Sequence, residues 1–232
     1  MIVNMHSLLR PIWLVVIGTA FAATFLYSTA IGEPAGRLVT KVVPVLCLAL
    51  WLLPRRNASA RWIMTGLLLS AIGDFCLEWS SSWFLAGLIS FLLAHIAYLT
   101  AYVSLVRRAR LILLVPVAAF GIGSFRILEP ALGEMRIPVA IYTTVICCML
   151  WRAWATVGER PSEPRKAWWA ALGATSFALS DTLVAWNRFV EPSTSLSLVL
   201  MLLYWGGQFA IAASASDDSP DIMRAGARSS AG

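Results

Sequence analysis

Two aspartates, Asp74 and Asp181, lie inside long apolar segments, and their local settings are similar. The first segment reads GLLLSAIGDFCLEW and the second reads GATSFALSDTLVAW. In each, a glycine precedes the aspartate by eight residues and a tryptophan follows it by five. A carboxylate near the middle of a bilayer costs at least about 2.5 kcal/mol, so intramembrane acids mark functional sites. Two acids that face one cavity are suited to proton transfer.

The composition is that of a membrane protein. The 232 residues are 59% apolar and 13% charged, which is too apolar for a soluble domain. A spanning helix needs about 20 mostly apolar residues. We therefore predict an all-α polytopic fold, with a single transmembrane domain over residues 1–216 and a disordered cytoplasmic tail over 217–232. The eight predicted spans cover residues 11–30, 37–54, 61–79, 83–106, 110–125, 137–157, 167–187 and 196–215.

The basic residues predict the orientation. Thirteen of the 18 Arg and Lys residues fall at the N-terminus, in or beside the second, fourth and sixth loops, and in the C-terminal tail, against four near the other loops. Lys41 lies inside a span. Because cytoplasmic loops are enriched in Arg and Lys, both termini are predicted to be cytoplasmic in a cell (plasma or inner) membrane. The net charge of +6 then reflects topology, and no nucleic-acid partner is predicted.

Polar side chains from five predicted spans gather at or above the membrane midplane, on the outer side. This depth follows from a rise of 1.5 Å per residue along each span. Asp74 and Asp181 are the predicted catalytic pair. The predicted substrate-binding residues are Lys41, Glu78, His95, Tyr98, Asn187, Tyr204 and Gln208.

Most of these residues also have a structural alternative. Tyr204 and Gln208 can be polar groups that pack between helices. Asp74 and Asp181 can be buried acids held by salt bridges or hydrogen bonds. Lys41 can be a cation that snorkels to the interface. His95 can be a helix–helix hydrogen-bond partner, and Glu78, one residue from a span end, can be a solvated charge. The four cysteines lack metal-site spacing and read as small core residues, so no metal and no cofactor are predicted.

The two aspartate segments also indicate an internal repeat. They are 107 residues apart, which corresponds to four spans, and both run in the same direction through the membrane. This arrangement predicts two parallel four-helix repeats, related by an axis along the membrane normal, with the site between the halves.

Four motifs resemble the YhhN-like family of integral membrane proteins, whose characterised members are lysoplasmalogenases. The resemblance runs in the family's order from about Lys41 to Gln208. It implies eight spans and hydrolysis of the sn-1 vinyl ether of lysoplasmenyl-ethanolamine or lysoplasmenyl-choline, which gives a fatty aldehyde and a glycerophospho-alcohol. The implied partners are a lysophospholipid substrate and membrane lipid; the oligomeric state stays open. The motifs are KVVPVLCLAL (Lys41), GLLLSAIGDFCL (Asp74), FLAGLISFLLAHIAYL (His95, Tyr98) and FALSDTLVAWNRF (Asp181).

The chemistry of a vinyl ether suits two carboxylates. Its terminal alkene carbon accepts a proton, and water captures the resulting oxocarbenium ion, as in two-carboxylate glycoside hydrolysis. Glu78 lies four residues after Asp74, and its negative charge favours a protonated Asp74. Ser180 and Thr182 flank Asp181, and their hydroxyls favour its ionised form. Asp74 is therefore the expected acid and Asp181 the expected base.

The alternative function is a proton-coupled membrane transporter of a small amphiphile. Buried Asp, His and Lys side chains also form proton relays, and a repeat with a central site is common among transporters. An enzyme releases aldehyde in detergent without a gradient, whereas a transporter shows flux only in sealed vesicles.

Overall fold

The computed structural model describes residues 5–34 and 36–216, and in this part of the chain the regular structure is helical, without strands. The all-α prediction is confirmed for these residues, and the predicted tail lies outside them. The α-helices are α1 (Met5–Ala30), α2 (Arg37–Leu52), α3 (Ala58–Trp79), α4 (Phe84–Leu105), α5 (Leu114–Leu132), α6 (Arg136–Ala155), α7 (Pro164–Phe189) and α8 (Thr194–Ser214).

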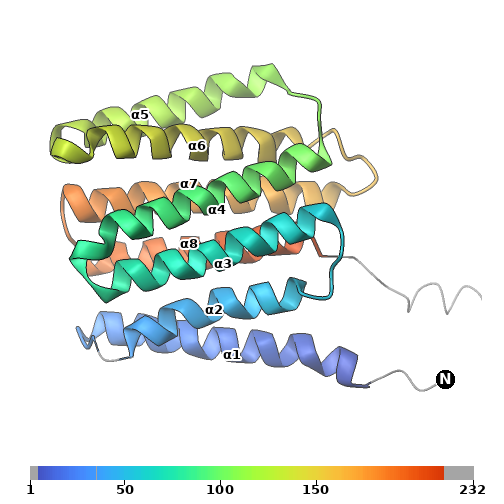
Figure 1. Ribbon diagram of the computed structural model, residues 1–232, viewed down its shortest axis with the longest axis horizontal. Coiled ribbons are helices and arrows are strands. Elements are labelled where there is room, and N and C mark those ends of the chain that lie inside the picture. The colour runs from blue at the N-terminus through green and yellow to red at the C-terminus, as the bar shows by residue number, and fades with distance from the viewer. Residues whose placement is uncertain (1–4, 35, 217–232) are drawn as a thin grey trace, which may run out of the picture.

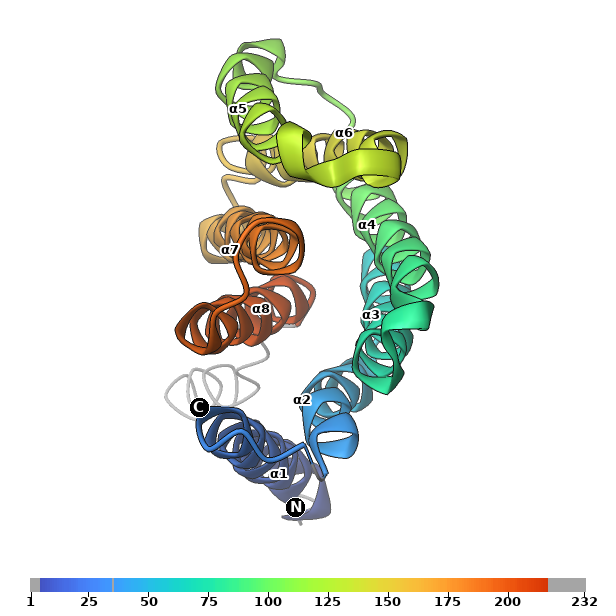
Figure 2. The same ribbon diagram turned by 90° about the vertical axis from the view of Figure 1, so that its left-hand side faces the viewer.

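The helices form an arc with a pair of helices inside it. The α1–α2, α3–α4, α5–α6 and α7–α8 connections all lie at one end of the bundle, on the left of Figure 1. Seen end-on, α1 to α6 follow a curve, and α7 and α8 lie side by side within it (Figure 2). Helix α8 contacts α1, α2 and α3, and α7 contacts α5 and α6. This arrangement brings helices from both halves of the chain around one space.

The outer faces of the helices are apolar. Five helical stretches are long and apolar enough to cross a membrane, and the fourth contains both α5 and α6. Leu85, Ile89 and Leu93 lie at successive turns of α4 and are exposed. Soluble proteins rarely expose apolar surface of this extent, so lipid covers these faces in an integral membrane protein. The five stretches are Ile12–Ala30, Ala58–Trp79, Ser81–Leu105, Leu111–Ala155 and Thr194–Ser214.

The helix boundary that differs most from the sequence prediction is the end of α5. The fifth span was predicted to end at residue 125, but α5 continues to Leu132. Glu129 forms an ion pair with Arg126 at 3.3 Å and a second one with Arg136. Leu128 and Leu132 of this extension are buried in an apolar cluster with Val139 of α6, so packing continues the helix past the polar residues after 125.

Two glycines allow α7 and α8 to pack closely. A Cβ atom added to Gly173 would lie 2.8 Å from the backbone nitrogen of Ile211, and one added to Gly207 would lie 2.9 Å from the backbone nitrogen of Phe177. Small residues at such positions let two helix backbones approach each other in a membrane. The sequence interpretation of Gly173 as a close-approach residue agrees with this packing.

We expect Gly173→Ala to destabilise the protein by about 1–3 kcal/mol, because the added methyl group overpacks against the α8 backbone. Gly206→Ala is the matched control, since nothing lies within 4 Å of a Cβ atom at that position. The measurement is thermal unfolding of both purified variants in detergent. Equal unfolding temperatures for the two variants would contradict the packing role of Gly173.

Candidate active site

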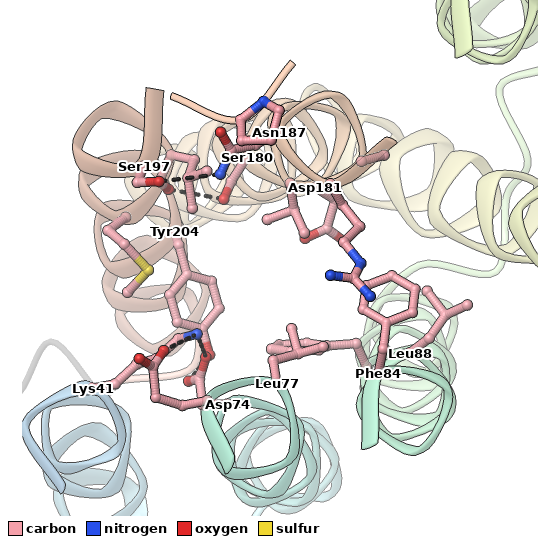
Figure 3. Close-up of a pocket in the computed structure, with 18 of the residues that line it drawn as sticks. Lys41, Asp74, Leu77, Phe84, Leu88, Ser180, Asp181, Asn187, Ser197 and Tyr204 are labelled. Carbon is pink, nitrogen blue, oxygen red and sulfur yellow. Dashed lines mark hydrogen bonds and ion pairs between the residues drawn. The ribbon is translucent and has the colours of Figure 1, made fainter. Parts of the chain in front are cut away.

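A cavity of about 390 Å³ lies near the α3–α4 and α7–α8 connections, whose residues Ser80, Ser81 and Pro192 line it. The cavity is lined by residues of α1, α2, α3, α4, α6, α7 and α8. The lining combines apolar side chains with charged ones. This size and composition are typical of small-molecule sites. Asp74 and Asp181 both line the cavity, and Figure 3 shows them on opposite sides of it.

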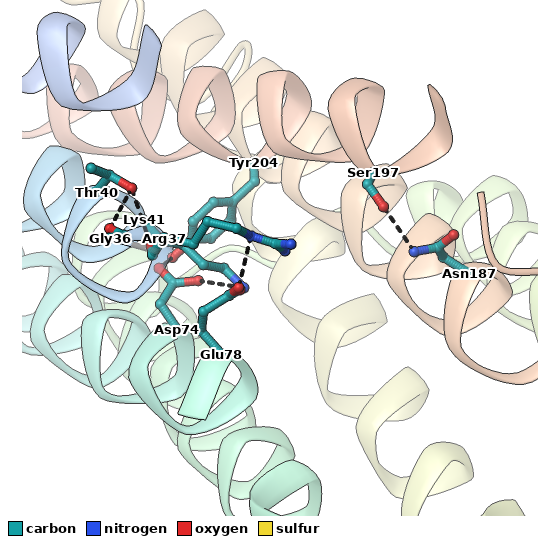
Figure 4. Close-up of polar contacts among 9 residues, drawn as sticks. All are labelled: Gly36, Arg37, Thr40, Lys41, Asp74, Glu78, Asn187, Ser197 and Tyr204. Atoms are coloured by element: carbon teal, nitrogen blue, oxygen red, sulfur yellow. Dashed lines mark hydrogen bonds and ion pairs between the residues drawn. The ribbon is translucent and has the colours of Figure 1, made fainter. Parts of the chain in front are cut away.

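Asp74, on α3, belongs to a compact polar cluster. Its carboxylate is 2% exposed; Tyr204 donates a hydrogen bond to its Oδ2 at 2.6 Å, and Lys41 Nζ lies 3.9 Å from its Oδ1. Lys41 Nζ also lies 3.3 Å from Glu78 Oε2, and Arg37 Nε lies 3.0 Å from Glu78 Oε1 (Figure 4). The two cations are four residues apart on α2, and the two acids are four apart on α3. Facing helical stripes of opposite charge therefore build the cluster.

Asp181, on α7, has different partners. The Tyr142 hydroxyl of α6 donates a hydrogen bond to its Oδ2. His95 Nε2, on α4, lies 3.3 Å from the same oxygen, and the imidazole is fully buried. His95 Nδ1 lies 2.6 Å from the backbone oxygen of Phe91, one turn earlier in α4. Three different helices thus position this carboxyl group and its partners.

Aromatic rings fill the seam between the inner helix pair and the arc. The ring of Phe177, on α7, has its centroid 4.7 Å from that of His95, 5.3 Å from Tyr204 and 6.1 Å from Tyr98. Phe91 packs edge-on against the same ring at 6.2 Å. Edge-to-face packing of this kind contributes about 0.5–1.5 kcal/mol per pair beyond burial. The seam holds α7 and α8 in register with α4, and so fixes the two carboxyl groups relative to each other.

Comparison with known proteins shows to which family the chain belongs. Residues 36–215 match the model of the YhhN family. The chain belongs to the YhhN family. It is 34% identical to lysoplasmalogenase TMEM86B of Homo sapiens over 179 residues, which is 76% of this chain and 74% of that relative. It is 32% identical to lysoplasmalogenase TMEM86A of Homo sapiens over 196 residues, 78% of this chain and 79% of that relative.

A bacterial member is also similar. Lysoplasmalogenase of Mycobacterium tuberculosis is 28% identical over 217 residues, which is 90% of this chain and 70% of that relative. No solved structure matches the chain. The family resemblance that the motifs indicated is confirmed, and it covers both aspartates of the cavity.

In this YhhN-family chain, the hydroxyls expected to surround Asp181 bond elsewhere. Ser180 donates to the backbone oxygen of Leu200 at 2.8 Å, and Thr182 donates to that of Ala178 at 3.0 Å. Hydroxyls on a helix commonly bond to backbone carbonyls in this way. The expectation that these two residues support an ionised Asp181 is therefore wrong.

Three of the predicted substrate-binding residues lie behind the cavity wall. His95, Tyr98 and Gln208 are fully buried and do not line the cavity. Tyr98 donates a hydrogen bond to Gln208 Oε1 at 2.7 Å, and its ring occupies the space that Gly66 leaves open. Packing turned these side chains toward other helices. They pack behind the residues that line the cavity.

The remaining predicted residues do line it, namely Lys41, Glu78, Asn187 and Tyr204. Asn187 donates to Ser197 Oγ at 3.1 Å, a contact visible in Figure 4, and accepts from the backbone N–H of Ser193 at 2.6 Å. It therefore ties the end of α7 to the start of α8 at the rim of the cavity.

Among the charged and tyrosine side chains that line the cavity, three were not predicted as site residues from the sequence: Arg37, Tyr142 and Arg188. Arg37 precedes Lys41 by four residues, a spacing that could have marked it. The guanidinium of Arg188 lies over the Phe84 ring, 5.0 Å from its centroid. Nothing in the local sequence marks Tyr142, because its role depends on α6 lying next to α7. Within residues 5–34 and 36–216, no group of three or more His, Cys, Asp or Glu side chains could hold a metal ion.

Proposed function

We propose that this protein is a lysoplasmalogenase, an ether hydrolase that cleaves the sn-1 vinyl ether bond of a lysoplasmalogen. The products are a fatty aldehyde and glycerophosphoethanolamine or glycerophosphocholine. Asp74 and Asp181 line one cavity inside a largely apolar helical bundle, and this arrangement carries the proposal. Relatives named lysoplasmalogenase in Homo sapiens and Mycobacterium tuberculosis support it.

The reaction needs one carboxylic acid and one carboxylate. The acid gives its proton to the second alkenyl carbon, and the electrons of the C=C bond form the new C–H bond. Positive charge then spreads over the first alkenyl carbon and the ether oxygen, where the carboxylate stabilises it. Water adds its oxygen to the first carbon and loses a proton. The hemiacetal collapses as its hydroxyl loses a proton, the C–O bond breaks and the glycerol oxygen gains a proton.

The charges at the cavity orient the lipid. A phosphate in a low-dielectric site needs cationic partners, and Arg37, Lys41 and Arg188 line the cavity. The head group lies among these cations. Apolar lining residues such as Leu88 and Val184 receive the first carbons of the alkenyl chain. A lysolipid with one chain enters sideways from the bilayer.

Aldehyde release by the purified protein in detergent tests the function. With lysoplasmenyl-ethanolamine and no gradient, we expect aldehyde and glycerophosphoethanolamine in equal amounts. In D₂O one deuterium should appear on the second carbon of the aldehyde, and ¹⁸O-labelled water should leave the glycerol product unlabelled. Substrate flux into sealed vesicles without any aldehyde would instead identify a proton-coupled transporter.

We expect Lys41→Met to raise KM for the lysoplasmenyl substrate about tenfold or more. The variant loses a charge-assisted hydrogen bond to the phosphate, and such a bond contributes about 1.5–3 kcal/mol. Because Lys41 Nζ lies 3.9 Å from Asp74 Oδ1, kcat should fall as well. Lys166→Met is the matched control, since Lys166 pairs with Glu163 outside the cavity. If KM and kcat are both unchanged in Lys41→Met, Lys41 is only an interfacial anchor.

All eight helices, α1 to α8, cross the membrane in this proposal, with the cavity toward the outer side and both termini in the cytoplasm. The excess of Arg and Lys near the opposite loops supports this orientation in a plasma or inner membrane. Topology reporters fused after Ser216 and within residues 133–135 should lie on opposite sides. Reporters on the same side would contradict the orientation.

The internal repeat is also part of the proposal. Contacts of α1 with α2, α2 with α3 and α3 with α4 have counterparts in contacts of α5 with α6, α6 with α7 and α7 with α8. The contact of α4 with α6 likewise corresponds to that of α8 with α2. These matched contacts support two parallel four-helix units, each contributing one aspartate to the site.

A further inference from the structure

The hydrogen bond of His95 to the backbone fixes its tautomer. Nδ1 lies 2.6 Å from the carbonyl oxygen of Phe91, and a carbonyl oxygen only accepts, so Nδ1 carries the hydrogen. In a neutral imidazole the other nitrogen then has a lone pair and no hydrogen. That nitrogen, Nε2, faces Asp181 Oδ2 at 3.3 Å. Within the described residues it has no other hydrogen-bond partner.

A lone pair and an ionised carboxylate oxygen repel each other at this distance. The pair of His95 and Asp181 must therefore hold one proton between them. If the proton were on the imidazole, an ion pair would form between a fully buried imidazole and a carboxyl group that is only 14% exposed, and the desolvation of such ions is costly. In the described part of the chain, Asp181 forms no ion pair with a Lys or Arg side chain. The neutral arrangement, with the proton on Asp181, is therefore favoured.

Asp74 is in the opposite situation. Tyr204 donates a hydrogen bond to it, as Tyr142 does to Asp181, but Asp74 also has a cation nearby, because Lys41 Nζ lies 3.9 Å away. The surrounding cluster contains two cations, Arg37 and Lys41, and a second carboxylate, Glu78. An ionised Asp74 makes this cluster neutral, whereas a protonated Asp74 leaves an uncompensated positive charge in a low-dielectric site.

We infer that His95 is the positioning residue that holds the catalytic proton on Asp181, so that Asp181 is the general acid and Asp74 the carboxylate that stabilises the cation. This inference rests on the proposed function, and it reverses the order expected from the sequence. The sequence showed only the neighbours of each aspartate on its own helix, whereas the partners that decide its protonation come from other helices.

The proton balance of the site is simple. Asp181 gives its proton to the alkenyl carbon and becomes a carboxylate facing the lone pair of His95, which favours its rapid reprotonation. The proton that water loses on attack passes to Asp74 or restores Asp181, and collapse of the hemiacetal consumes none. The other titratable groups that face the pair are Tyr142 from α6 and, across the cavity, Asp74 and its cluster.

Two substitutions of His95 test its role by kinetics. His95→Phe keeps a planar ring against its aromatic neighbours but removes the acceptor, and we expect kcat to fall about 10²-fold with KM unchanged. His95→Gln keeps an acceptor oxygen and should stay within about tenfold of the parent protein. The high-pH limb of the rate profile should move in His95→Phe and not in His95→Gln. A His95→Phe variant with the parent kcat and profile would overturn the inference.

Infrared spectroscopy tests the proton position without any turnover, so it remains informative even if no aldehyde is released. Near neutral pH the parent protein should show the C=O stretch of a protonated carboxylic acid, and this band should shift in D₂O. The band should disappear in Asp181→Asn and persist in Asp74→Asn. Loss in Asp74→Asn alone, persistence in both variants, or absence from the parent protein would each overturn the assignment.

Discussion

Aldehyde release is expected to fall about 10²- to 10⁴-fold in Asp181→Asn, the range that a general acid contributes. An asparagine keeps the shape of the side chain but has no proton to give to carbon. Its amide N–H can still donate to His95 Nε2, so the fold should be retained. KM should change little, because the cations at the cavity are untouched. The measurement is kcat with lysoplasmenyl-ethanolamine across a pH series.

Glu134→Gln is the control for this experiment, since Glu134 is an exposed carboxylate outside the cavity. It should release aldehyde at the parent rate. In Asp181→Asn the residual activity should also lose its decline at high pH, which reports deprotonation of the acid. Near-full activity would make Asp181 a structural residue, and loss of the low-pH limb instead would return the acid role to Asp74.

Asp74→Asn is expected to lower kcat over the same range of about 10²- to 10⁴-fold, for a different reason. Without the carboxylate, the cluster of Arg37, Lys41 and Glu78 carries a net positive charge next to the cation that develops on the substrate. The Tyr204 hydrogen bond can be retained, because the amide oxygen of asparagine accepts it. The low-pH limb of the pH–rate profile should disappear, because the carboxylate that has to be ionised for activity is no longer present.

A double variant separates charge from shape at this position. Asp74→Asn combined with Lys41→Met restores a neutral cluster, so its loss in kcat should be smaller than the sum of the two single losses. The comparison needs kcat for all four proteins, together with thermal unfolding to show that each is folded. Additive losses would mean that Asp74 does not act through charge.

The sequence by itself determined the apolar environment of the site and predicted its depth. Apolar segments of spanning length, the distribution of Arg and Lys and a rise of 1.5 Å per residue are local properties, and helix geometry converts them into depth. They predicted that Asp74, Asp181, Lys41 and Tyr204 gather in one half of the bundle, and in the structure all four line one cavity. The sequence also indicated that two helices approach closely at Gly173, and its motifs indicated the YhhN family.

Only the tertiary structure decided which side chains meet. Periodicity says which face of a helix a residue occupies, but not which helix that face meets. Tyr142 and His95 reach Asp181 because α6 and α4 both adjoin the seam beside α7. Tyr98 turns from the cavity because Gly66 leaves room for its ring. The protonation of the two acids depends on these contacts between helices, so it could not be read from neighbours along the chain.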